Sequence, residues 1–181
     1  MENPYKRKKE PEVSKQLILA AAAEIGASDW HRVTFQAIAD KTGLSKGGII
    51  HHFRNKEDLL KELMNQSLVE LTEWIVEEKK SSGKEVGSLA FLRFIIGKSN
   101  DLFYRRTMKI ITQVILINPE YRKGWGEWFS THIGHGDDSA QGIKHLIVML
   151  VADGLWYSDN LGIYNISDEK KQQILETLIK L

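Results

Sequence analysis

The stretch TFQAIADKTGLSKGGIIHHFRNKEDL, residues 34–59, decides the fold of this chain. Its apolar and capping residues predict one short helix at about 35–41 and a second at about 45–53, with a tight turn at 42–44 between them. Two short helices joined by a glycine-containing turn of three or four residues form a helix-turn-helix. The first prediction is therefore a helix-turn-helix unit near the N-terminus.

Five side chains of this stretch have the character that such a unit requires. Ala39 is small where the two helices must approach each other, and Gly43 suits a turn that needs a positive φ angle. Ile49 is apolar where the second helix must pack against the first. Thr34 and Ser45 carry hydroxyl groups that can cap the two helices. Their combined spacing is more specific than any one of them.

The second helix has an unusual composition. Gly47 and Gly48 fall within a short helix, where each glycine costs about 1 kcal/mol relative to alanine. A glycine pair is useful where the helix backbone must come close to another molecule, such as a DNA groove. Nearby side chains can donate hydrogen bonds to phosphate oxygens or base edges: Lys46, His51, His52, Arg54 and Lys56. The alternative interpretation is a glycine-tolerant surface helix.

The rest of the chain is predicted to be all-α. Apolar residues recur at spacings of three and four, and the alternation typical of strands does not occur. A helix at 12–25 is expected to bury one face made of Val13, Leu17, Ala21 and Ile25. Asn55 is expected to cap a long helix that ends near 81–83. Further helices are expected at 88–98, 101–117, 119–132, 138–161 and 167–181.

Composition excludes several classes of protein. The chain has 181 residues and a formal net charge of +1, which is ordinary for a globular protein. It contains no cysteine, which excludes disulfides, thiolate metal sites and cysteine nucleophiles. Its apolar runs are far shorter than the ~20 residues that span a membrane, and no signal peptide is evident. These features predict a cytoplasmic protein without a cofactor.

Residues 13–60 resemble the DNA-binding domain of TetR/AcrR-family transcriptional regulators. The matching residues are Ile18-Leu19, Ala21-Ala22, Thr34, Ile38-Ala39, Gly43-Leu44-Ser45, Gly47, His52-Phe53, Lys56 and Leu59. The remainder is similar to the family only in architecture. The resemblance implies a DNA-binding domain at 1–60 and a helical effector-binding and dimerisation domain at 61–181. It further implies a repressor that leaves a palindromic operator when a small aromatic or lipophilic effector binds.

The expected DNA contacts follow from the helix-turn-helix. They are Thr34, Thr42, Ser45, Lys46, Gly47, Gly48, His51, His52 and Lys56. Family members usually carry one or two tyrosines before the His-Phe pair, where this chain has Ile50 and His51. Histidine can still donate to phosphate, whereas Ile50 is expected either to pack inward or to contact a thymine methyl group. The family's aromatic residue near the end of the first helix is also replaced, around Ile25-Gly26.

Aromatic residues are frequent after residue 70 and are read as core or as the wall of an effector pocket. The candidates for the pocket are Trp74, Phe91, Phe94, Phe103, Trp125, Trp128 and Trp156. Aromatic faces attract cations, and Glu73 or Asp153 is a candidate countercharge. Arg105, Arg106 and Lys109 equally suit an anionic effector.

The last two predicted helices carry more apolar surface than a terminal helix pair needs. A second copy of the chain would cover it, as a two-fold four-helix bundle. The candidate dimer contacts are Ile143, Ile147, Leu150, Ile174, Leu178 and Leu181. One helix-turn-helix also reads too few base pairs to be specific, which favours a homodimer on a palindrome.

Three weaker patterns leave alternatives open. The basic run Lys6-Arg7-Lys8-Lys9 is either an arm that contacts DNA or a solvated, disordered tail. His132, His135, Asp137 and Asp138 offer metal-ligand chemistry, but the glycines between them favour a polar loop without metal. No enzyme motif occurs. The alternatives to the regulator are a DNA-binding protein of the same fold without an effector and, more remotely, a helical enzyme or binding module.

Overall fold

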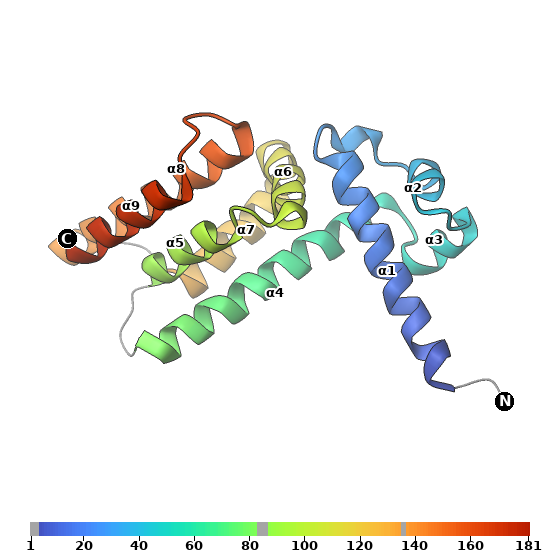
Figure 1. The fold of residues 1–181 in the computed structure, drawn as a ribbon, viewed down its shortest axis with the longest axis horizontal. Coiled ribbons are helices and arrows are strands. Elements are labelled where there is room, and N and C mark those ends of the chain that lie inside the picture. Colours follow the sequence, from blue (N-terminus) through green and yellow to red (C-terminus); the bar gives the residue numbers. More distant parts are fainter. Residues whose placement is uncertain (1–3, 83–86, 135–136) are drawn as a thin grey trace. The chain divides into compact units, whose positions relative to one another are not determined.

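The computed structural model describes the backbone of residues 4–82, 87–134 and 137–181 (Figure 1). Within these ranges every regular element is a helix, as predicted. The elements are α1 (Pro4–Gly26), the 3-10 turn η1 (Trp30–Arg32), α2 (Phe35–Thr42), α3 (Lys46–His52), α4 (Lys56–Ser82), α5 (Gly87–Lys98), α6 (Leu102–Ile117), α7 (Pro119–His132), α8 (Ala140–Leu161) and α9 (Asp168–Lys180).

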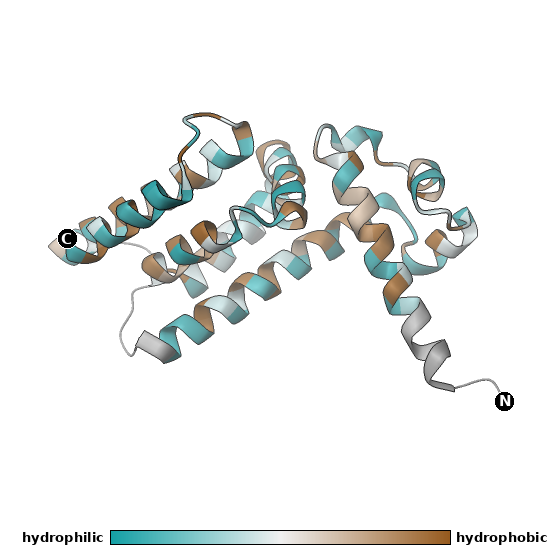
Figure 2. Ribbon diagram, viewed as in Figure 1, coloured by the Kyte–Doolittle hydropathy of each residue, from teal (hydrophilic) through white to brown (hydrophobic). Residues whose placement is uncertain are grey.

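The chain divides into two compact units. The first contains the described residues up to Ser67, together with Arg106–Gln113 of α6. The second contains the described residues of Leu68–Arg105 and Val114–Leu181. Helix α4 therefore contributes its first three turns to the first unit and the rest to the second. Hydrophobic and hydrophilic bands alternate along this helix, as an amphipathic helix requires (Figure 2).

The helix termini follow the predicted caps. The Thr34 hydroxyl oxygen accepts a hydrogen bond from the Ala37 amide at 3.0 Å, and the Ser45 hydroxyl oxygen accepts one from Gly48 at 3.1 Å. The Asn55 side chain accepts a hydrogen bond from Asp58 N at the start of α4. Gly43 ends α2 with φ 74°, the left-handed conformation predicted for the turn.

Helix α1 differs from the prediction in two respects. It begins at Pro4, so the backbone of the basic run at 6–9 is helical, and contact of this run with DNA stays a prediction. Pro11 lies inside the helix, although its ring removes one backbone hydrogen bond and crowds the preceding turn. The predicted apolar face is wrong in its first half, since Val13 is 64% exposed and Leu17 is exposed as well, whereas Ala21 is buried as predicted.

The reason is the helical period. A four-residue repeat advances by roughly 40° per step around a helix of 3.6 residues per turn, so four such positions spread over about a third of the circumference. The face that α1 buries consists of the predicted Ala21 together with Ile18, Leu19, Ala22 and Ala23. Helix α2 packs against this helix and α3 packs against α2.

In the second unit, α5 forms the centre of the core. Helix α5 packs mainly against α8 and also against α9. Its buried residues occupy nearly every side of the helix: Gly87, Ser88, Leu89, Ala90, Phe91, Leu92, Phe94 and Ile95. Such an all-round apolar helix is typical of a core position.

The start of α8 depends on Gly142. A Cβ atom at this position would overlap the backbone of Asp137, whereas a Cβ at the exposed Gly124 of α7 would meet nothing. We expect Gly142→Ala to lower the free energy of unfolding by about 1–3 kcal/mol, because the loop must move. Gly124→Ala should raise it by about 0.5–1 kcal/mol through helix propensity.

Urea unfolding followed by circular dichroism measures both effects. Equal midpoints for Gly142→Ala and the wild type would show that the 137–142 contact does not constrain this loop.

Candidate DNA-binding site

Helix α3 has one buried and one exposed face. Ile49 is completely buried, as is Ile38 of α2, which fixes the orientation of α3 in the first unit. The predicted role of Ile49 is thereby confirmed. The opposite side of the helix is exposed, and so is Arg54 after it; the exposed residues of the helix are Lys46, Gly47, Gly48, Ile50 and His51. His52 is half-buried.

This surface is basic although the whole chain is nearly neutral. Residues 41–56 contain no Asp or Glu and include Lys41, Lys46, Arg54 and Lys56. Lys41 is held by Glu24 at 2.6 Å, but no ion pair involves Lys46 or Arg54 among the described residues. A local cluster of positive charge on an exposed helix is typical of a nucleic-acid contact.

The three hydroxyl residues predicted to contact DNA have different surroundings. Thr34 and Ser45 are exposed, and their oxygens cap α2 and α3. The Thr42 hydroxyl instead donates to the Ile38 carbonyl oxygen at 2.8 Å and accepts from the Leu44 amide at 3.3 Å. Its proton is therefore used within the turn.

The two glycines of α3 also differ from each other. A Cβ at Gly48 would lie 3.2 Å from the Ser45 hydroxyl oxygen and would crowd the cap. A Cβ at Gly47 would meet nothing within 4 Å. The chain itself thus gives a packing reason for Gly48 and none for Gly47.

Ile50 does not pack inward. Its side chain is 44% exposed on the same surface as Lys46 and His51, so that alternative is wrong. Contact with a thymine methyl group stays the prediction for this residue.

Lys56 is held by a residue that the sequence analysis did not identify. Its ammonium group donates to the Trp30 carbonyl oxygen and lies 4.7 Å from the centre of the Trp30 ring. Burial lowers the pKa of Lys56, and the nearby Asp29 partly opposes that shift. Lys56 thus joins the start of α4 to η1, and its reach toward DNA is limited by this contact.

Trp30 organises the first unit. Its backbone amide donates to Gln113 Oε1 of α6 at 3.2 Å, and a Cβ added to the buried Gly26 would lie 3.0 Å from its ring. The ring therefore fills the space beside Gly26, where the family's aromatic residue is missing. The only sequence signal was a tryptophan in an otherwise polar loop between two predicted helices.

The seven aromatic candidates for an effector wall fall into separate groups in the second unit. Trp74 contacts Phe94 edge-on, and Phe94 contacts Tyr104. A second group joins Phe91, Trp125, Trp128 and Phe129. Trp156 contacts Tyr157, and Phe103 is 38% exposed.

The metal alternative gains no geometric support. His132 is used within α7, where its ring stacks on Trp128 and its Nδ1 lies 2.9 Å from the Trp128 carbonyl oxygen. His135 lies outside the described residues. In the part of the chain that the structure describes, no group of three His, Asp or Glu side chains is placed to hold a metal ion.

The described helices include none long and apolar enough to cross a membrane.

Two family models match the chain. The one described as bacterial regulatory proteins of the tetR family matches residues 17–63, and the tetracyclin repressor-like C-terminal domain matches residues 89–181. None of the curated protein sequences matches the chain.

Solved structures with the same fold cover nearly the whole chain. A transcriptional regulator from Rhodococcus sp. Rha1 has a TM-score of 0.66 at 17% identity, covering 92% of this chain and 94% of its own. A protein from Saccharomonospora viridis in complex with choline has a TM-score of 0.66 at 19% identity, covering 93% and 96%. The multidrug binding protein EbrR complexed with malachite green has a TM-score of 0.59 at 15% identity, covering 91% and 96%.

The contacts of Trp30 generate a test of the first unit. We expect Trp30→Leu to lower the free energy of unfolding by about 1–3 kcal/mol, because it removes ring packing and the cation–π contact with Lys56. His31→Ala, in the same turn but exposed, should change it by less than about 0.5 kcal/mol. Urea unfolding measures both, and an unchanged midpoint for Trp30→Leu would contradict the role assigned to this ring.

Proposed function

The chain belongs to the TetR family of bacterial regulatory proteins, and on that premise we propose that it is a transcriptional repressor. It binds a palindromic operator in DNA as a homodimer and leaves that operator when a small organic effector binds. Residues 1–60 form the DNA-binding domain, and residues 61–181 form the effector-binding and dimerisation domain. The proposed site of action is the cytoplasm.

The observation that carries DNA binding is the exposed face of α3. It combines Lys46 and His51, with Arg54 just after the helix, and a glycine, Gly47, that has no packing reason within the chain. Glycine at an exposed helical position costs about 1 kcal/mol relative to alanine. Close approach of the DNA backbone explains why this cost is retained. Ile50 then supplies an apolar contact on the same face.

Helix α8 supports the homodimer. It exposes a stripe of large apolar side chains: Ile143, Leu146, Ile147, Leu150, Tyr157 and Leu161. An apolar stripe of this length on one helix favours a partner surface. A second copy of the chain is the proposed partner, because the two-fold axis of a palindromic operator requires one.

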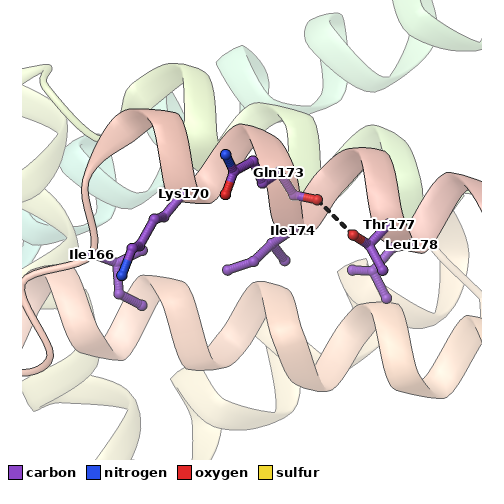
Figure 3. Close-up of a pocket in the computed structure, with 6 residues that line it drawn as sticks. All are labelled: Ile166, Lys170, Gln173, Ile174, Thr177 and Leu178. Atoms are coloured by element: carbon purple, nitrogen blue, oxygen red, sulfur yellow. Dashed lines mark hydrogen bonds between the residues drawn. The ribbon is translucent and has the colours of Figure 1, made fainter.

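Helix α9 is the second helix of the proposed dimer surface. A surface groove of about 410 Å³ is lined by Ile166, Lys170, Gln173, Ile174, Thr177 and Leu178 (Figure 3). Leu178 is buried by its own chain and Ile174 is half-buried, so both help to fold the second unit. Leu181 is exposed and remains a proposed dimer contact.

Relatives of the same fold support an organic effector. One was crystallised with choline and another with malachite green. Both ligands are organic cations, and the second unit of this chain is rich in aromatic side chains that suit such ligands.

Gly47 provides the sharpest test of DNA binding. The operator is first obtained by selecting bound DNA from a random library. We expect Gly47→Ala to stabilise the fold and yet to weaken operator binding by at least about tenfold, because the methyl group holds the helix away from the groove. Gly124→Ala, an equally open helical glycine in α7, should stabilise the fold and leave binding unchanged.

Binding is measured by fluorescence anisotropy at several salt concentrations. Lys46→Ala should reduce the slope of log K against log salt by about 1 if its ammonium contacts a phosphate. Wild-type affinity of the Gly47→Ala protein would refute the close-approach argument.

The dimer proposal has its own test. Leu150 is 63% exposed on α8, and Leu150→Glu should convert the dimer to monomer because a charge cannot be buried there unpaired. Val76→Glu changes a similarly exposed apolar residue of α4 outside the stripe and should leave the dimer intact. Sedimentation velocity over a range of concentrations distinguishes the two. A dimeric Leu150→Glu protein would place the interface elsewhere.

A further inference from the structure

Helix α8 carries three polar side chains that each have a polar group without a partner in the described chain, although the Asn160 amide nitrogen donates to the Trp156 carbonyl oxygen at 2.9 Å. The Trp156 Nε1 and Asn160 Oδ1 atoms are both buried without a hydrogen-bond partner. Asp153 is half-buried, and no ion pair or hydrogen bond reaches its carboxylate from the described residues. We call Asp153, Trp156 and Asn160 the α8 polar row.

The row forms one strip along the helix. Its members are spaced by three and four residues, which places neighbouring side chains on the same face of a helix. The strip is distinct from the buried positions of α8 such as Ala152 and Leu155. It is also distinct from the exposed apolar stripe that contains Leu150 and Tyr157. The row therefore belongs neither to the packed core nor to the proposed dimer surface.

Buried polar groups in folded proteins nearly always have a hydrogen-bond partner, because a buried donor or acceptor that has lost water without gaining a partner costs free energy. Two such atoms lie on one strip of α8 beside the half-buried Asp153 carboxylate, so the strip offers a donor, an acceptor and a negative charge to a ligand from outside the chain. We propose that the α8 polar row is the polar end of the effector site and that it selects a small organic cation that carries a hydroxyl group. This inference rests on the regulatory function proposed above and names the class of its effector.

Each member of the row demands a different feature of the ligand. The Trp156 N–H group needs a hydrogen-bond acceptor, and Asn160 Oδ1 needs a donor. A hydroxyl group is both a donor and an acceptor, so it satisfies the two together. The Asp153 carboxylate needs a positive charge, and an indole ring also attracts a cation through its face.

The charges elsewhere in the chain favour a cation over an anion. Arg105 donates to the Asp159 carbonyl oxygen at 2.9 Å. Arg106 belongs to the first unit and pairs with Glu24 at 3.3 Å. Two of the three basic side chains that suited an anionic effector are therefore engaged.

Between the two candidate countercharges, the structure favours Asp153. Glu73 is exposed to solvent, whereas Asp153 is half-buried. Burial raises the pKa of Asp153, and no positive group opposes that shift. A bound cation would supply the missing charge.

Isothermal titration calorimetry on the full-length protein tests the proposal with choline as the probe. Its neutral carbon analogue, 3,3-dimethylbutan-1-ol, has the same shape without the charge. We expect choline to bind the wild type and the neutral alcohol to bind at least about tenfold more weakly. Asp153→Asn should weaken choline binding at least about tenfold, and Glu73→Gln should leave it unchanged.

A second pair of measurements tests the hydroxyl preference. Ethyltrimethylammonium is choline without its hydroxyl group, and the wild type should bind it more weakly than choline. Trp156→Phe keeps an aromatic face but removes the N–H group, so it should reduce the difference between the two ligands. A retained difference in Trp156→Phe would remove Trp156 from the proposed row.

Stability gives a readout independent of binding. Without ligand, Asp153→Asn should raise Tm at pH 7, because the folded state disfavours the unpartnered carboxylate. This destabilisation is absent below the pKa of Asp in the unfolded chain, grows between that pKa and the raised folded pKa, and is fully present above the folded pKa. A lower Tm for Asp153→Asn would show that the carboxylate has a structural partner and would overturn the proposal.

The outcomes separate this inference from the proposed function. Choline binding that is equal in wild type and Asp153→Asn, or no binding of choline at all, overturns the assignment of the row. Operator binding by the same wild-type preparation then leaves the DNA-binding regulator standing, without this effector class. Failure to select any DNA would instead contradict the regulator itself.

Discussion

Burial of Ile49 is the constraint on which the DNA-binding surface depends. Ile49 and Ile38 are completely buried, so α3 can present only its opposite side to solvent. That side carries Lys46, Gly47 and His51. Gly43 allows α3 to pack against α2 in this orientation, because its left-handed φ of 74° ends α2 and turns the chain toward α3. A single apolar contact and a single permissive residue thus decide which chemistry faces outward.

Helix α8 of the second unit carries an exposed apolar stripe and a set of polar groups without partners, and each suits a different kind of binding partner. The stripe of α8 that contains Leu150 is apolar and exposed, which suits a second protein surface. In the α8 polar row, Trp156 Nε1 and Asn160 Oδ1 are buried without hydrogen-bond partners beside the half-buried Asp153, which suits a small polar ligand. One helix therefore links dimerisation to effector binding in the function proposed here. A ligand shifts the dimer between DNA-binding and released states only through its difference in affinity for them.

The local structure was predictable because it is coded by neighbouring residues. The caps at Thr34 and Ser45 and the positive φ of Gly43 involve groups within three residues of each other. Two predictions were wrong because they depended on the helical angle over several turns or on contacts with other helices. The apolar face assigned to α1 through Val13 drifted around the helix, and the inward alternative for Ile50 could be excluded only from its exposure.

The sequence by itself determined the all-α fold, the helix-turn-helix and the residues near α3, because hydrophobic period, capping and turn chemistry are local properties. Only the tertiary structure revealed Trp30 as the residue that holds Lys56 and Gln113, since these lie far apart along the chain. The tertiary structure likewise separated the aromatic residues into distinct groups and left Trp156 Nε1 and Asn160 Oδ1 without partners. Whether a polar atom is satisfied depends on every element packed around it, and no local pattern records that.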